Sequence, residues 1–287
     1  MRYKRHPFRR WFLTLLYILL FSVLIGGCCP YLREGIDGRY DSSHLYVDGI
    51  DRLLEKVVSN IYRIETSTSF RVGEDTSTLR ALGMAFSIDD RHLLTAKHVT
   101  SIDRFQVQTP FGLMTFPVSP EDKVEETTTI VFDDGSRVPV RVIYRDELLD
   151  FALLEAGVKV NPPLYPVGNS GDFRIANAVI LPSNFQRGLN IRLGYVSQLD
   201  FIQYGPNGEI ADKDENIFGI STVVNEGESG SPILFLRDGK VELGGIVSFI
   251  VLPARGLGYG LKISPVIERV RKDAEYKELF LAPPSRP

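Results

Sequence analysis

The sequence predicts an all-β fold, either a barrel or a sandwich. From about residue 58 to residue 263 the chain consists of short β-rich runs separated by turn signals, with no helices alternating between them. The Asp-Gly pairs at 134–135 and 238–239 are typical of hairpins. No internal repeat of solenoid period is present. The expected strands are 58–66, 83–88, 91–95, 138–144, 177–182, 191–197, 231–236 and 241–251.

Composition describes an ordinary globular chain. Of its 287 residues, 44% are hydrophobic and 24% are charged, which excludes a disordered or collagen-like protein. The net charge is -3, and from residue 28 onward 36 acidic residues outnumber 28 basic ones. We therefore expect no nucleic-acid partner. The two cysteines, Cys28 and Cys29, are adjacent, so neither a disulfide framework nor a cysteine-based metal site is expected.

The N-terminus has the pattern of a targeting segment. Residues 1–10 are basic, 11–25 are almost wholly apolar, and Ile25-Gly26-Gly27-Cys28 resembles a bacterial lipobox. We interpret residues 1–27 as a signal peptide or membrane anchor, with Cys28 as the lipidation site and 28–54 as a tether. Fifteen helical residues span about 22 Å, less than a bilayer core of about 30 Å. A lipoprotein, an uncleaved anchor and plain secretion all remain open, and all three export the rest of the chain.

Two further segments organise the remainder. The proline-rich run at 161–168 is expected to link two halves of the domain. Ser264-Pro265 is a helix-start signal, and apolar residues follow it at helical spacing, so a helix is predicted over 264–281.

Three local patterns suggest nucleophilic catalysis when they are taken together. His98 follows an apolar run, Asp150 opens another, and Ser229 lies in a Gly/Ser-rich turn. A serine hydroxyl needs a base to take its proton, and a buried carboxylate holds that base in the right tautomer. The order His, Asp, Ser is that of chymotrypsin, and differs from subtilisin and the α/β-hydrolases. Asp146, four residues earlier, is a rival carboxylate.

The turn around the serine also offers electrostatic stabilisation. Gly227 allows a tight turn in which its N–H and that of Ser229 converge on a developing oxyanion. No cluster of side chains has metal-ligand spacing, and no Gly-rich loop precedes a helix. We therefore expect no metal and no other cofactor.

Many short motifs in order make the chain resemble the trypsin-like serine proteases, and most closely their HtrA/Deg branch, over roughly residues 55–272. This resemblance implies two six-stranded antiparallel β-barrels of the chymotrypsin type, at 55–160 and 161–265, followed by a short C-terminal helix and tail at 266–287. The matching motifs are Gly83–Asp89, Val131–Gly135, Val140–Val142, Asp146–Leu154, Pro166–Ser170, Gly194–Ser197, Gly245–Ser248 and Gly256–Leu261.

The resemblance also implies a role for each site residue. His98 corresponds to the general base, Asp150 to the residue that orients it and Ser229 to the nucleophile, with Gly227 and Ser229 supplying the oxyanion-hole N–H groups. Asp150 is preferred over Asp146 because Ala-Leu-Leu follows at 152–154, as in the family strand.

Substrate-binding residues follow from the same resemblance. The segment from Ser248 to Ile250 is expected to pair with the substrate backbone as an added strand. Val223 would lie at the bottom of the primary specificity pocket. An apolar residue there predicts cleavage after a small or medium aliphatic residue.

Three features depart from the family pattern. Glu228 stands where Asp or Asn is usual. In trypsin-like zymogens an acid here pairs with a newly cut N-terminus, but no matching activation site is visible, so we expect Glu228 to support the turn. Ser231 replaces the second glycine after the nucleophile. No PDZ domain is expected to follow.

These observations predict an exported, membrane-tethered serine endopeptidase that acts through an acyl-enzyme on proteins or peptides, in HtrA-like envelope quality control or processing. It is expected to face the periplasm or the cell exterior, held by its lipid or anchor. A catalytically silent binding or chaperone module and an esterase on the same fold remain alternatives. The sequence leaves the oligomeric state open.

Overall fold

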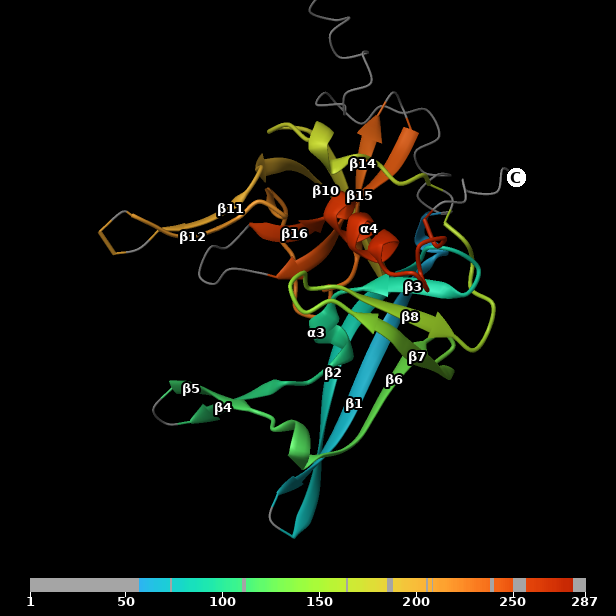
Figure 1. The fold of residues 1–287 in the computed structure, drawn as a ribbon, viewed down its shortest axis with the longest axis vertical. Helices are drawn as coiled ribbons and strands as arrows, with labels where there is room; N and C mark the ends of the chain where they lie inside the picture. Colours follow the sequence, from blue (N-terminus) through green and yellow to red (C-terminus); the bar gives the residue numbers. More distant parts are fainter. Residues whose placement is uncertain are drawn as a thin grey trace, which may run out of the picture. The chain divides into compact units, whose positions relative to one another are not determined.

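A computed structural model of the chain describes residues 57–280, except 73, 110, 111, 164, 185–187, 205, 208, 238, 239 and 250–256. Almost all regular structure in these residues is antiparallel strand, which confirms the predicted all-β class (Figure 1). No helix in this part of the chain is long and apolar enough to cross a membrane. The predicted leader, the tether and Cys28 lie outside the described residues.

Six strands close the first barrel in the order β1-β2-β3-β8-β7-β6. Their bounds are β1 Ile61–Val72, β2 Asp75–Ser87, β3 His92–Thr95, β6 Lys123–Val131, β7 Arg137–Arg145 and β8 Ala152–Ala156. The predicted hairpin at Asp134-Gly135 connects β6 to β7. Gly135 has a φ of 82°, a conformation that glycine adopts without a Cβ penalty.

The second barrel closes in the order β10-β13-β16-β15-β14-β9. Its strands are β9 Ala178–Asn184, β10 Leu189–Gln198, β13 Ile217–Ile220, β14 Pro232–Arg237, β15 Lys240–Phe249 and β16 Gly258–Lys262. Two closed six-stranded antiparallel barrels are the architecture that the family resemblance implied, and the structure confirms it.

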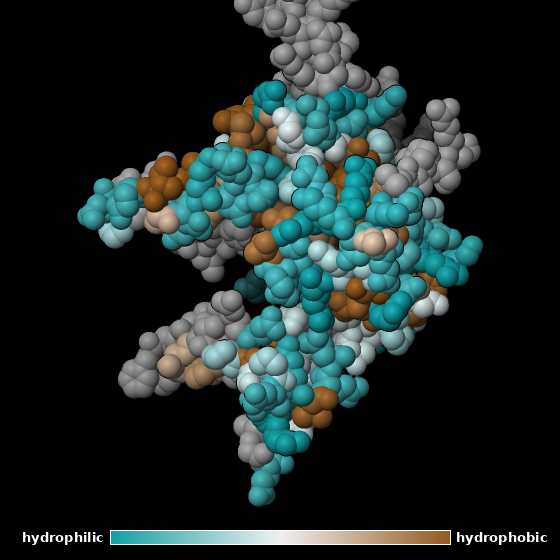
Figure 2. Space-filling view, in the orientation of Figure 1, coloured by the Kyte–Doolittle hydropathy of each residue, from teal (hydrophilic) through white to brown (hydrophobic). Residues whose placement is uncertain are grey.

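Two hairpins outside the barrels were not anticipated. One is formed by β4 (Arg104–Thr109) and β5 (Gly112–Pro117), the other by β11 (Phe201–Tyr204) and β12 (Ile210–Asp214). Each is a separate two-stranded sheet that projects from the chain's barrels (Figure 1). Both expose apolar side chains among polar ones (Figure 2). The exposed apolar residues are Met114, Phe116, Ile202 and Ile210.

Helices are short in the described residues. They are α3 (Lys97–Thr100), the 3₁₀ turns η1 (Pro120–Asp122) and η2 (Ser170–Asp172), and α4 (Ile263–Lys272). The C-terminal helix predicted over 264–281 therefore ends nine residues early. Apolar residues continue at helical spacing beyond Lys272, but the chain forms turns there. The ring of Tyr276 packs edge-on against Tyr144, and its hydroxyl donates to the carbonyl of Ile143.

One buried cluster of apolar side chains draws on both barrels and on α4. Phe86, Leu94 and Phe151 come from the first barrel and its approach to β8, Leu234 and Ile246 from the second, and Val266 from the helix. All six are fully buried. The two barrels therefore share this cluster, in addition to one that each forms alone, and a site on their facing edges has rigid support from both sides.

Candidate active site

His98 lies on α3, the short helix that follows β3. The next two residues, Val99 and Thr100, are buried and fix the helix, while the His98 side chain is half exposed. A Cβ on Gly83 of β2 would lie 2.5 Å from a Val99 methyl group. The glycine thus permits β2 to pass close to Val99 of the helix that carries the histidine.

Asp150 holds His98 through two contacts. Its Oδ2 lies 2.8 Å from His98 Nδ1, and its Oδ1 accepts the backbone N–H of His98 at 3.1 Å. The hydroxyl of Ser248, on β15 of the other barrel, donates to the same Oδ2 at 2.6 Å. The carboxylate therefore receives three donors from two separate parts of the fold.

The charge state of Asp150 defines the histidine's tautomer. Burial raises the pKa of the Asp150 carboxyl, but the hydrogen bonds from His98 and Ser248 and the charge of His98 outweigh it, so the pKa lies below its ordinary value. An ionised carboxylate only accepts hydrogen bonds, so Nδ1 must be the donor. The lone pair of neutral His98 is then on Nε2, away from Asp150.

The rival carboxylate, Asp146, has other partners. It accepts backbone N–H groups from Leu148 and Leu149 and the hydroxyl of Tyr144, and it forms an ion pair with Arg269 of α4 at 3.2 Å. It shapes the loop that leads to the catalytic candidate rather than contacting the histidine.

Ser229 is the second residue of the second of two consecutive tight turns, which share Glu228. In each turn the N–H of the fourth residue donates to the carbonyl of the first, from Glu228 to Asn225 at 3.1 Å and from Ser231 to Glu228 at 3.0 Å. The third residue of each is a glycine with a φ of 86° or 87°. A positive φ at this position alone defines a type II turn, which favours glycine there.

We call residues 225–231 the serine turn; it is attached to both barrels. Met84 of β2 donates its N–H to the carbonyl of Ser229 at 2.8 Å, and the N–H of the following glycine donates to Val247 of β15 at the same distance. The Ser229 hydroxyl donates to the carbonyl of Ser248 at 3.2 Å. The candidate nucleophile is therefore held where the two barrels meet.

Two backbone donors on this turn are unused. Among the described residues, the N–H groups of Gly227 and Ser229 donate to no acceptor. In the same part of the chain no hydrogen bond joins the hydroxyl of Ser229 to His98. The arrangement thus offers a base with a free nitrogen, a hydroxyl and two N–H groups suited to an oxyanion.

A comparison with known protein families identifies the family of this chain. A family model described as a trypsin-like peptidase domain matches residues 83–242, more than half of the chain. The chain belongs to the trypsin-like peptidase family. The resemblance inferred from the motifs is therefore confirmed.

A solved structure of another protein has a similar fold. An HtrA-type protease, AlgW, whose structure is described as containing a decapeptide, superposes with a TM-score of 0.55. The match covers 78% of this chain and 67% of that one, at 15% sequence identity. At that identity the match shows a shared fold.

Sequence reasoning found no partner for Glu228, and the structure supplies one. Glu228 is only 2% exposed. One carboxylate oxygen accepts the Ser183 hydroxyl at 2.9 Å, and the other accepts the Asn225 N–H at 2.7 Å and forms an ion pair with Arg192 of β10. No sequence pattern marked Arg192, because the apolar residues Leu189, Leu193 and Tyr195 alternate on the other face of β10.

The residues predicted to bind substrate in this peptidase occupy different surroundings. Ser248 is buried and contacts both Asp150 and Ser229. Val223 precedes the serine turn and is 52% exposed, while the next residue is buried in the barrel. Ile250 lies outside the described residues. The specificity assigned to Val223 therefore stays a prediction.

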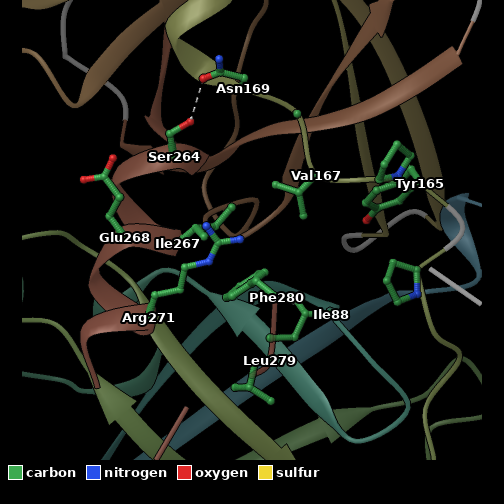
Figure 3. Close-up of a pocket in the computed structure, with 13 residues that line it drawn as sticks. Ile88, Tyr165, Val167, Asn169, Ser264, Ile267, Glu268, Arg271, Leu279 and Phe280 are labelled. Carbon is green, nitrogen blue, oxygen red and sulfur yellow. Dashed lines mark hydrogen bonds between the residues drawn. The ribbon is translucent and has the colours of Figure 1, made fainter. Parts of the chain in front are cut away.

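Two pockets lie near the joined barrels of the peptidase. One, of about 730 Å³, is lined by His98 and Asp150, and an ion pair between Lys97 and Glu147 lies at its side. The other, of about 570 Å³, lies between the inter-barrel linker and α4 and contains none of the candidate site residues (Figure 3). Ser264 and Asn169 share a hydrogen bond of 3.5 Å on its wall (Figure 3).

Proposed function

We propose that this peptidase is an exported, membrane-attached serine endopeptidase in which His98, Asp150 and Ser229 form a catalytic triad. The observation that carries the proposal is the pairing of His98 with an ionised Asp150 beside a serine whose turn leaves two N–H groups unused. Family membership supports peptide hydrolysis.

The proposed chemistry uses each group once in each half-reaction. Ser229 Oγ attacks the scissile carbonyl carbon while its proton passes to His98 Nε2, and Asp150 stabilises the resulting imidazolium. The N–H groups of Gly227 and Ser229 bind the oxyanion. His98 then donates the proton to the leaving amine, and an acyl-enzyme remains. Water attacks the ester by the same route, regenerating the serine and releasing a carboxylic acid.

Peptide substrates are proposed to lie along β15 beside Ser248. The HtrA-type protease of similar fold is described with a decapeptide, which supports this class of substrate. We also propose that residues 1–27 direct export and that Cys28 carries lipid or adjoins an anchor, because the basic, apolar and lipobox-like segments follow one another in the order of a lipoprotein signal. The proposed roles are HtrA-like quality control or processing at the envelope.

The test compares the full chain in detergent with Ser229→Ala, using unfolded casein and a fluorophosphonate probe. We expect cleavage and labelling in the wild type and neither in Ser229→Ala. Ser197→Ala is the matched control, because it removes a buried hydroxyl in the same barrel that has no hydrogen-bond partner among the described residues.

Other outcomes would favour one of the alternative functions. Labelling without protein cleavage would favour an esterase or a narrow substrate range. A folded wild type that is neither labelled nor active would overturn the proposal in favour of a binding or chaperone module.

A further inference from the structure

Resting on the proposed function, we propose that Arg192 is a positioning residue: its ion pair with Glu228 holds the serine turn in the conformation that forms the oxyanion hole. The hole is then assembled within the chain itself, and no cut N-terminus is required. Arg192, a residue on β10, would thus keep the oxyanion hole assembled at all times.

The position of Glu228 explains how the ion pair can act on the oxyanion hole. Its own N–H and carbonyl close the two type II turns, and its neighbours Gly227 and Ser229 carry the two unused N–H groups. Its carboxylate accepts hydrogen bonds from the Ser183 hydroxyl and the Asn225 N–H, and it forms the ion pair with Arg192. Whatever fixes this carboxylate therefore fixes the peptide groups on both sides of it.

Arg192 is the cation of this cluster. Its side chain is 17% exposed, on the inward face of β10, and Glu228 is its ion-pair partner among the described residues. Neutral donors alone satisfy a buried carboxylate poorly, because removing the cation leaves an uncompensated charge in the protein interior. A Glu228 without Arg192 would turn toward water and carry the serine turn with it.

Glycine at 227 makes the turn able to respond. Its φ of 86° is readily exchanged for a negative value because glycine has no Cβ. Rotation of the Glu226–Gly227 peptide would move one unused N–H away from the oxyanion position. Loss of one such donor reduces kcat by about 10²–10³.

The experiment compares Arg192→Gln, Arg192→Lys and Glu228→Gln with the wild-type full chain. Arg237→Gln is the matched control, because Arg237 lies in the same barrel at similar exposure and pairs with Asp172 and Glu242, away from the serine turn. The readouts are kcat and KM on a peptide substrate, the thermal midpoint, and amide hydrogen exchange in the segment 222–232.

We expect Arg192→Gln and Glu228→Gln to lower kcat about 10²-fold or more with little change in KM, and to raise exchange in 222–232. Arg192→Lys should recover part of kcat because it keeps the charge. Arg237→Gln should lower the thermal midpoint by a similar amount and change neither kcat nor exchange in 222–232. An N-terminal extension of the full chain should leave kcat unchanged.

Equal kcat and equal exchange in a folded Arg192→Gln would overturn the inference, as would a kcat that depends on the N-terminal extension. If the wild type has no Ser229-dependent activity, the proposed function fails, and the exchange of 222–232 still decides whether Arg192 orders the turn.

Discussion

At the residue scale, single atoms serve more than one purpose in this site. Asp150 Oδ2 receives both His98 Nδ1 and the Ser248 hydroxyl, at 2.8 and 2.6 Å. Charge-assisted hydrogen bonds of this length are about twice as strong as neutral ones. The barrels are thus joined at the carboxylate that orients the candidate base, and the donor from β15 holds that carboxylate in place.

Gly230→Ala is predicted to destroy the serine turn. Residue 230 has a φ of 87°, and a Cβ there would lie 2.0 Å from the carbonyl oxygen of Met84 and 2.5 Å from the Thr95 hydroxyl. We expect a loss of about 2–4 kcal/mol in the free energy of unfolding, since strain and a backbone clash combine. Urea unfolding measures it. Gly188→Ala shares the positive φ but meets no neighbour within 4 Å, so it should cost less.

His92 is predicted to give the stability a pH dependence near neutrality. The hydrogen bond that His92 Nδ1 donates to the Asp89 carboxylate raises the pKa of His92 above its usual 6.5. This contribution is therefore complete below about pH 6.5 and is lost as the pH rises through the folded-state pKa. Urea unfolding at pH 6 and pH 9 should show a fall of at most about 1 kcal/mol from this pair. His92→Gln should remove that component, and an unchanged pH profile would contradict the assignment.

At the element scale, α4 and the turns after it tie the end of the second barrel to the first. Arg269 pairs with Asp146, whose carboxylate caps the loop before Asp150. Tyr276 adds its hydrogen bond to Ile143 and its contact with Tyr144. The helix thereby supports the loop that precedes Asp150.

Arg269→Gln is predicted to destabilise this loop and to lower activity several-fold. Asp146 is buried, and losing one charged donor costs about 1–3 kcal/mol. Thermal unfolding and kcat are the measurements. Arg271→Gln, two residues along the same helix and exposed, is the control and should change neither. An Arg269→Gln protein with wild-type stability would show that the N–H donors of the loop suffice for Asp146.

At the scale of the whole described domain, the shared core predicts that the barrels unfold together. Leu234 of β14 belongs to the same buried cluster as Phe86 of β2. Each barrel also has a buried cluster of its own, so it is this crossing cluster that couples the unfolding of one barrel to that of the other. Cooperative unfolding is the expected consequence.

Leu234→Ala tests this coupling. Truncating a fully buried leucine costs about 2–5 kcal/mol. Native-state hydrogen exchange should show that the slowest amides of β2 lose as much protection as those of β14. Protection lost in the second barrel alone would contradict a common core. Leu189→Ala, at an exposed position on β10, should leave both strands unchanged.

Local patterns and chain order predicted the all-β class and brought His98 and Asp150 together as candidates, and the family resemblance implied the two barrels. The sequence analysis did not predict the β4–β5 and β11–β12 hairpins, which form two-stranded sheets separate from the barrels. It also missed Arg192. The outward positions of β10 include Leu189, Leu193 and Tyr195, so the apolar alternation marks the wrong face as the core side. The early end of α4 was missed because turns after Lys272 use the same apolar spacing as a helix.

The carbonyl of Ser248 has a consequence for how the peptidase would begin a turnover. In the resting protein this oxygen accepts the Ser229 hydroxyl. An extended chain pairing with β15 would direct a backbone N–H to the same oxygen and compete with the hydroxyl for it. The displaced hydroxyl would then find its next acceptor in the free nitrogen of His98. Binding of a substrate along β15 would then also align the Ser229 hydroxyl with its base. Without a bound substrate, the serine would stay unaligned and would react little with other esters and amides.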